Sequence, residues 1–276
     1  MIRAAIARHR EREFTRTHTF NAEGIIAGAE SLTLPGTRAG AILLLHGYND
    51  SPQSLHFMAA ALHARGWSVR VPLLPGHGRQ LRDWAATNAA AWERAARAEL
   101  AALKRAHDSV AVGGLSMGGA LAFMLAAEDP TVRAVVGFAP YLHTSGPVEL
   151  LALIAPLASL GAKYFASGGG RSVHDPVAAD GMIAYRCSTP RLALELLKIV
   201  KHARAGLASV KQPVLVIQSR EDNRIPPAGA AEAFAMIGSD DKTLHWTAGN
   251  GHVITVDYGH EAVEKTAADW LDRRMA

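Results

Sequence analysis

Continuous apolar runs that alternate with helical segments limit what this 276-residue chain can fold into. The run Gly40–Leu45 contains no polar residue, and Val214–Ser219 begins with four apolar residues. A strand that is apolar throughout is buried on both faces, as in parallel sheets that helices cover on each side. We therefore expect an α/β protein with a mostly parallel sheet flanked by helices, joined by right-handed crossovers.

The same reasoning predicts the remaining elements along the chain. Further strands are expected at residues 14–20, 30–34, 67–72, 109–113, 132–139 and 242–246. Helices are expected at residues 1–13, 51–65, 87–107, 117–128, 189–202, 228–236 and 261–274. For the helix at 51–65, Ser51 is the expected N-cap, Pro52 suits the first turn and Gly66 ends the helix.

The long stretch between Pro140 and Val214 carries no strand-like run. We interpret residues 141–206 as a helical cap inserted into an α/β core of residues 30–140 and 207–276, preceded by an N-terminal extension of residues 1–29. Residues 147–165 hold too many large apolar groups to remain in water, so one face should pack on the carboxyl edge of the sheet. The other face should line a substrate pocket with Tyr141, Ile154 and Leu157. Packing without a pocket is the alternative.

Composition limits the classes of partner and the cellular compartment that we expect. The chain has 29 Lys and Arg against 25 Asp and Glu, and no dense basic block follows its first sixteen residues, so a nucleic-acid partner is not expected. The N-terminus lacks the apolar core of a secretory signal, which favours a cytoplasmic protein. No apolar run has the length of a membrane span, so stable membrane insertion is not expected. The oligomeric state stays open.

The helix expected at residues 1–13 carries Ile2 and Ile6 among arginines. It is either a loosely docked terminal helix or a membrane-surface helix with a thin apolar face, so transient lipid contact stays open. The single cysteine, Cys187, excludes an intramolecular disulfide and is expected to pack as a small apolar group. The histidines do not fall in metal-ligand spacing, so neither a metal nor a cofactor is expected.

The sequence Gly114-Leu-Ser-Met-Gly118 follows an expected strand and opens an expected helix. This context makes Gly-x-Ser-x-Gly informative, because a sharp strand-to-helix turn exposes the serine and brings backbone close to the flanking glycines. Neither phosphate-loop pattern is present. Ser116 is therefore the expected nucleophile.

A serine nucleophile needs a base and an acid that orients the base. On this type of fold they follow the serine in the order acid, then histidine. His252 lies in a Gly-rich turn after the last strand, whereas His245 falls inside that strand and His260 at the start of the last helix. The base should therefore be His252.

The acid is expected in the polar turn that follows the strand Val214–Ser219. Asp222 is the preferred residue, and its neighbour Glu221 is the rival. Two backbone N–H groups should bind the oxyanion, those of Met117 and of Tyr48 in the loop after Gly40–Leu45. His46 is expected to brace that loop.

These motifs resemble those of the α/β-hydrolase family, and within it the bacterial carboxylesterases and monoacylglycerol lipases. The resemblance covers roughly residues 30–275 and rests on short segments at 43–47, 74–78, 114–118, 221–226 and 251–252. It implies the triad Ser116, Asp222 and His252, the oxyanion donors Tyr48 and Met117, and a small cap after the sixth strand of the fold. The extension before Glu30 departs from the short esterases.

The sequence thus predicts a serine carboxylic-ester hydrolase that acts on a small lipophilic ester with a short to medium acyl chain, through an acyl-enzyme intermediate. One alternative is the same triad used on another bond, as in thioesterases, amidases, acyltransferases or C–C hydrolases. The other is a catalytically silent binding protein on the same scaffold.

Overall fold

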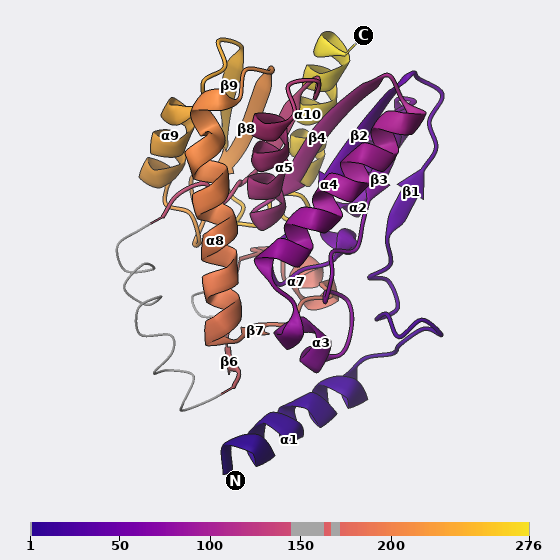
Figure 1. Ribbon diagram of the computed structural model, residues 1–276, viewed down its shortest axis with the longest axis vertical. Coiled ribbons are helices and arrows are strands. Elements are labelled where there is room, and N and C mark those ends of the chain that lie inside the picture. Colours follow the sequence, from indigo (N-terminus) through magenta and orange to yellow (C-terminus); the bar gives the residue numbers. More distant parts are fainter. Residues whose placement is uncertain (1, 145–162, 167–171, 276) are drawn as a thin grey trace.

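A seven-stranded sheet forms the centre of the computed structural model, which describes residues 2–144, 163–166 and 172–275 (Figure 1). The strand order is β1-β3-β2-β4-β5-β8-β9. β1 pairs antiparallel to β3, and every other neighbouring pair in this sheet is parallel, as expected. The strand bounds are β1 Leu32–Leu34, β2 Gly40–Leu45, β3 Ser68–Val71, β4 Ser109–Leu115, β5 Val135–Phe138, β8 Val214–Ser219 and β9 Lys242–Thr247.

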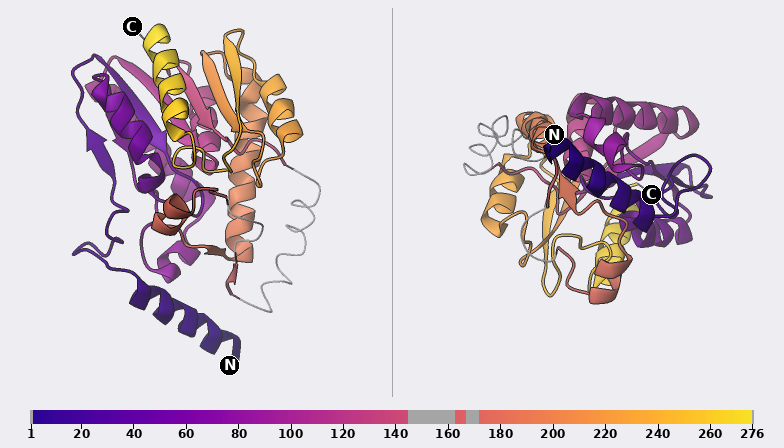
Figure 2. Two further views of the ribbon diagram at one scale, coloured as in Figure 1. Left: turned by 180° about the vertical axis from the view of Figure 1, so that it is seen from behind. Right: turned by 90° about the horizontal axis from the view of Figure 1, so that it is seen from below.

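Helices cover both faces of the sheet, and each face has its own apolar cluster. One face packs against α2 (His56–Ala64) and α10 (His260–Arg274), with Trp67 among the buried residues. The other face packs against α4 (Ala89–Ala106), α5 (Met117–Glu128) and α8 (Pro190–Gly206). β2 and β8 are buried along their whole length because apolar side chains point to both layers. Figure 2 shows α10 on the face opposite α8.

Shorter elements complete the described chain: η1 (Pro52–Leu55), α3 (Leu81–Ala86), α7 (Pro176–Gly181), η2 (Leu207–Ser209) and α9 (Pro227–Met236). α3 and α7 were not expected from the sequence. The helix expected from Ser51 begins instead with the 3₁₀ turn η1. In the part of the chain that is described, no helix is long and apolar enough to cross a membrane.

The expected strand at residues 14–20 is wrong, because α1 (Ile2–Thr17) continues through most of it. Ala7 and Phe14 lie seven residues apart and therefore on one face of the helix, and both contact the apolar cluster on the α5 side of the sheet. The ring of Phe14 stacks on Tyr185, with ring centroids 5.3 Å apart. The packing of this helical face stabilises the helix, although residues 14–20 have the alternating pattern that is typical of a short strand. Of the expected strand, only Phe20 forms an isolated bridge, to Ile26.

The insertion follows β5, the strand expected to precede it. Contrary to expectation it contains strands, β6 (Phe165–Ala166) and β7 (Cys187–Ser188), which pair antiparallel. Residues 145–162 and 167–171, which include most of the apolar segment 147–165, lie outside the described residues.

Within the segment expected as the cap, α8 packs on a face of the sheet beside α5, and the described residues before it pack on loops at the carboxyl ends of the strands. The Tyr185 N–H donates to the Asn49 carbonyl, and the Val253 N–H donates to the Ser172 carbonyl, at 3.1 and 3.0 Å. The insertion therefore contacts both the loop after β2 and the loop after β9.

Candidate active site

Ser116 lies at the sharp turn between β4 and α5, in a backbone conformation that side chains rarely adopt. Its φ and ψ are 55° and −114°. A Cβ at Gly114 would stand 2.3 Å from the backbone of Gly118, and one at Gly118 would stand 1.9 Å from the Leu45 carbonyl oxygen. Only glycine fits at these two positions, which is the reason the sequence motif needs them.

Ser116, His252 and Asp222 come together in one hydrogen-bonded row, although 136 positions separate the serine from the histidine. His252 Nε2 lies 2.8 Å from Ser116 Oγ, and His252 Nδ1 lies 2.8 Å from Asp222 Oδ2. All three residues are buried, with 7–8% of their surface exposed. This is the geometry in which a carboxylate orients an imidazole and the imidazole can take the serine proton.

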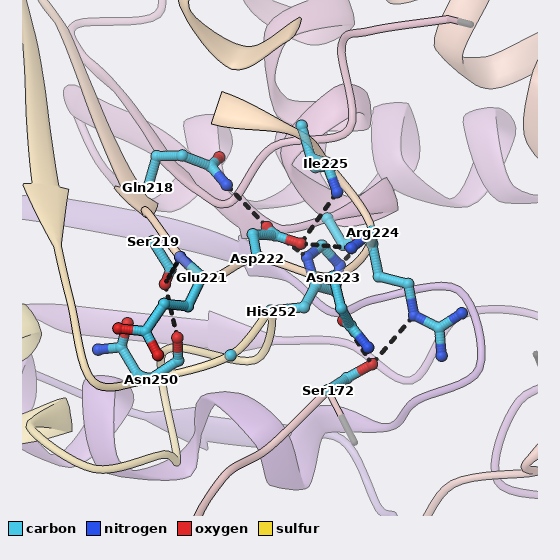
Figure 3. A network of polar contacts seen from close by, with 12 residues as sticks. Ser172, Gln218, Ser219, Glu221, Asp222, Asn223, Arg224, Ile225, Asn250 and His252 are labelled. Carbon is cyan, nitrogen blue, oxygen red and sulfur yellow. Dashed lines mark hydrogen bonds and ion pairs between the residues drawn. The ribbon is translucent and has the colours of Figure 1, made fainter. Parts of the chain in front are cut away.

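The turn after β8 holds the Asp222 carboxylate firmly (Figure 3). Its Oδ1 accepts the backbone N–H groups of Arg224 and Ile225 at 2.7 and 2.9 Å. Its Oδ2 accepts the side-chain amide of Gln218 at 2.7 Å as well as His252. Burial alone would raise the pKa of Asp222, but His252 and these backbone donors outweigh burial and lower the pKa. The carboxylate is therefore ionised at neutral pH.

The alternative acid, Glu221, and the alternative bases, His245 and His260, have side chains that make no hydrogen bond to the triad residues. Glu221 is exposed, and its Oε1 accepts the Gly249 N–H at 2.7 Å, so it fastens the loop before His252 and does not contact the imidazole. His245 is an exposed residue of β9. His260 begins α10 and hydrogen-bonds to Glu264 at 2.6 Å.

Met117 and Tyr48, the expected oxyanion donors, lie directly after the serine and in the loop after β2. Met117 is the first residue of α5, so its N–H has no acceptor within the helix. Tyr48 belongs to the loop after β2, and its carbonyl accepts a hydrogen bond from His77 Nε2 at 2.6 Å. The Tyr48 N–H belongs to the preceding peptide, whose Gly47 carbonyl accepts from His46 Nδ1 at 2.9 Å, so His46 holds the peptide that carries this N–H.

His46 and His77 are fully buried supports of this loop. His46 Nε2 accepts the Leu74 N–H at 3.1 Å, and the His77 ring lies 4.7 Å from the His46 ring. Burial lowers the pKa of His46 well below its usual value and that of His77 to about 4. Both are neutral at physiological pH, in agreement with the bracing role expected for His46.

Of the three residues expected to line the substrate pocket, only Tyr141 is among the described residues. Tyr141 is half-buried, and its N–H donates to the Ser116 carbonyl at 3.0 Å, so it follows the serine closely in space. Burial raises the pKa of its hydroxyl. Ile154 and Leu157 lie outside the described residues.

Cys187 is half-buried against the apolar cluster, and burial raises the pKa of its thiol.

Gln218 was not singled out by sequence, and Asp50 was expected only on the polar side where the alcohol leaves. Gln218 is inaccessible and contacts Asp222. Asp50 is buried in the loop that carries Tyr48, and burial raises its pKa to about 6. A polar residue near the end of an apolar strand is the signal for Gln218. Within the described ranges, no group of three or more His, Cys, Asp or Glu side chains is placed to hold a metal ion.

Comparison with known proteins shows the family of the chain. The sequence model of the family described as serine aminopeptidase, S33 matches residues 36–258. A thermostable monoacylglycerol lipase from Bacillus sp. (strain H-257) is 28% identical over 249 residues, which cover 90% of this chain and 96% of the lipase. A carboxylesterase from Bacillus subtilis (strain 168) is 25% identical over 84% of this chain and 92% of its own length.

Solved structures share the fold. A structure from work on the metagenome-derived lipolytic enzymes LipS and LipT has a TM-score of 0.81 and 28% identity, and covers 90% of this chain and 99% of its own. The monoacylglycerol lipase of Paleococcus ferrophilus has a TM-score of 0.75 at 20% identity, over 88% and 98% of the two chains. The expected resemblance is confirmed: the chain belongs to the serine aminopeptidase, S33 family of α/β-hydrolases.

Proposed function

We propose that this protein is a serine carboxylic-ester hydrolase that works through an acyl-enzyme intermediate. Ser116 Oγ attacks the ester carbonyl carbon while His252 Nε2 takes the serine proton. His252 then gives that proton to the leaving alcohol, and the acyl group stays on Ser116. Water attacks the acyl-enzyme with His252 again as base, and the acid product leaves.

The observation that carries the proposal is the continuous row from Ser116 Oγ through the imidazole to Asp222 Oδ2, with both hydrogen bonds at 2.8 Å. A binding protein has no need for an ionised, buried carboxylate aligned behind a histidine and a strained serine. The relatives described as monoacylglycerol lipase and carboxylesterase support an ester as the bond that is cleaved.

In the proposed mechanism, the N–H groups of Tyr48 and Met117 bind the oxyanion of the tetrahedral intermediate. Removing a single donor from such a site typically costs about 10² to 10³ in rate. His46 Nδ1 donates to the Gly47 carbonyl at 2.9 Å and so holds the peptide that carries the Tyr48 N–H, which favours a donor that is already in place before the substrate binds.

We further propose that the part of residues 141–206 that precedes α8 acts as a cap, since α8 itself covers a face of the sheet, and that the substrate is a lipophilic ester of short to medium chain length. Tyr141, Ile154 and Leu157 would line the acyl side of the pocket, and the alcohol would leave near Asn49 and Asp50. Each buried methylene adds about 0.8 kcal/mol of binding, roughly fourfold per carbon. Specificity should therefore rise from acetyl to medium-chain esters and stop rising where the pocket ends.

The experiment is a series of p-nitrophenyl esters of increasing chain length, measured on the wild type and on Ile154→Asp. The charge should weaken kcat/KM for medium-chain esters and spare the acetyl ester. An equal loss on both would assign the segment to the scaffold, and a wild-type preference for acetyl would contradict the lipophilic-acyl proposal.

A second candidate is cleavage of an amide or peptide bond by the same residues, because the matching family is described as serine aminopeptidase. Aminoacyl p-nitroanilides, measured beside the ester series, separate the two. Turnover of the anilides above that of every ester would replace the ester proposal.

A further inference from the structure

Gln218 is a buried side chain that touches the acid of the proposed triad. It is the residue before last in β8, where the strand carries the chain into the turn of Asp222. No part of it is exposed to solvent. Its Nε2 donates to Asp222 Oδ2 at 2.7 Å, and Figure 3 shows the amide pointing at this carboxylate from the strand side.

The oxygen that Gln218 contacts is the one that receives His252. Asp222 Oδ2 accepts from both His252 Nδ1 and the amide, whereas Oδ1 accepts the two backbone N–H groups of the turn. The backbone donors fix one end of the carboxylate. The amide fixes the other end and competes with the imidazole for the same negative charge.

Burying the Gln218 amide costs free energy, which indicates that its contact with Asp222 has a role. Among the described residues, Gln218 Oε1 is buried and has no hydrogen-bond partner. An unpaired buried polar atom costs about 1–3 kcal/mol, and an apolar side chain of the same length would avoid that cost. The reverse orientation of the amide would place Oε1 against a carboxylate oxygen, so the donor must face Asp222.

We propose that Gln218 is a positioning residue of the hydrolytic reaction, which aligns Asp222 Oδ2 with His252 and draws off part of its charge. The proposal rests on the proposed function of Ser116, His252 and Asp222. Gln218 touches no reacting atom in this arrangement and acts through the carboxylate.

The Gln218 amide withdraws negative charge from the Asp222 carboxylate, which weakens the attraction between this carboxylate and the protonated form of His252. Loss of the amide donor should strengthen that attraction, so His252 would keep its second proton to a higher pH and be available as a base only above it. Other charged or titratable groups act in the same neighbourhood. Asp50 interacts electrostatically with His252, and Tyr141 and Arg224 lie near Asp222. These groups are unchanged between wild type and variant, so the comparison isolates Gln218.

The first test is the pH profile of kcat/KM for Gln218→Met on a p-nitrophenyl ester. The acidic limb should move up by about 0.5 to 1 pH unit, and the plateau should fall about tenfold because the carboxylate is less well aligned. The matched control is Gln212→Met. Gln212 is also buried, and its amide donates to the carbonyls of Ala126 and Asp129 at 2.8 and 3.2 Å, at the other end of α5.

The control should lose stability without moving the acidic limb. A Gln218→Met profile that coincides with that of the control overturns the proposal, as does an equal shift in both variants. Failure of the wild type to cleave any ester or amide would instead refute the proposed function, so the two failures are distinguishable.

Gln218→Glu keeps the test open if the Met variant does not fold. When protonated, the introduced carboxyl group can donate to Asp222 as the amide does. When ionised, it removes the donor and adds a second negative charge beside Asp222. Activity relative to wild type should therefore fall steadily as the pH rises from about 5 to 8. A ratio that does not change with pH overturns the proposal.

Discussion

Glu221 and Asp222 are neighbours in sequence, yet their carboxylates meet different partners. Asp222 Oδ2 lies 2.8 Å from His252 Nδ1, whereas Glu221 binds the Gly249 N–H. Asp222→Asn should lower kcat by about four orders of magnitude, because an amide at this position favours the wrong tautomer of the histidine. Glu221→Gln should stay within a few-fold of wild type. Steady-state kinetics of the two purified variants checks this, and the opposite ranking would move the acid to Glu221.

Asp50 should lower the free energy of unfolding at neutral pH, because its carboxyl group is buried. Burial raises its folded-state pKa from 3.8 to about 6, so between these values the folded protein binds more protons than the unfolded chain. Stability from this group is therefore present at acidic pH and lost as the pH rises to about 6. Asp50→Asn should be more stable than wild type at pH 8, on the order of 3 kcal/mol, and nearly equal to it at about pH 4.

Urea unfolding at the two pH values measures this difference. A gain that is the same at both would mean that ionisation of Asp50 is not its cause. The gain would also show that the loop keeps a costly carboxylate next to Tyr48.

Ser116, His252 and Asp222 were predictable from sequence because each lies just after a recognisable strand and the chain order is fixed by the fold. The contact of Gln218 with Asp222 and the burial of Asp50 were not predictable, because they depend on which way one side chain points and how deeply it is buried. A pattern of residue types does not carry either property.

At the scale of elements, the turn between β4 and α5 depends on a close approach of two backbones. Gly118→Ala would place a methyl group 1.9 Å from the Leu45 carbonyl oxygen, so β2 and α5 would have to separate. We expect a loss of about 3 kcal/mol in the free energy of unfolding, even though alanine favours helix by about 1 kcal/mol over glycine.

The matched control is Gly181→Ala at the end of α7, where no atom lies within 4 Å of the added Cβ. It should change stability by less than about 0.5 kcal/mol. Denaturant titration of both variants tests the claim, and equal effects would contradict it.

Long elements were predicted best, because α4, α5 and β8 each carry enough residues for a periodic or continuous apolar pattern. The two-residue strands β6 and β7 exist through their mutual pairing, which no local pattern reports. The expected strand at 14–20 is wrong for a related reason: besides its helical neighbour His18, Phe14 packs on Tyr185, which lies far along the chain.

At the scale of the whole molecule, the N-terminal arm of residues 2–29 ties together segments that are distant in sequence. Glu11 pairs with Lys163 at 2.6 Å, and the Ile26 N–H donates to the Gly78 carbonyl at 2.7 Å. Ile25 and Ile26 are buried in a small cluster that also contacts partly buried apolar side chains of the body: Leu73 and Ile183. The arm precedes the part matched by the family model, which begins at residue 36, so that match does not report how the arm packs.

Deleting residues 2–29 should lower the free energy of unfolding by several kcal/mol, because each large buried apolar side chain contributes about 1.5–3 kcal/mol. Glu11→Gln, which removes only the ion pair with Lys163, should cost less than about 1 kcal/mol. Thermal and urea unfolding of the two proteins measures both effects. A truncated chain as stable as the full one would show that the arm is not part of the folded unit.

The central claim is that Ser116 is a nucleophile activated by His252, and covalent labelling tests it most directly. A fluorophosphonate probe should add one phosphonyl group per chain, with loss of fluoride, and peptide mapping should place it on Ser116. Ser116→Ala should not react, and His252→Ala should react far more slowly. No adduct on the folded wild type, or an adduct on another residue that persists in Ser116→Ala, would contradict the account.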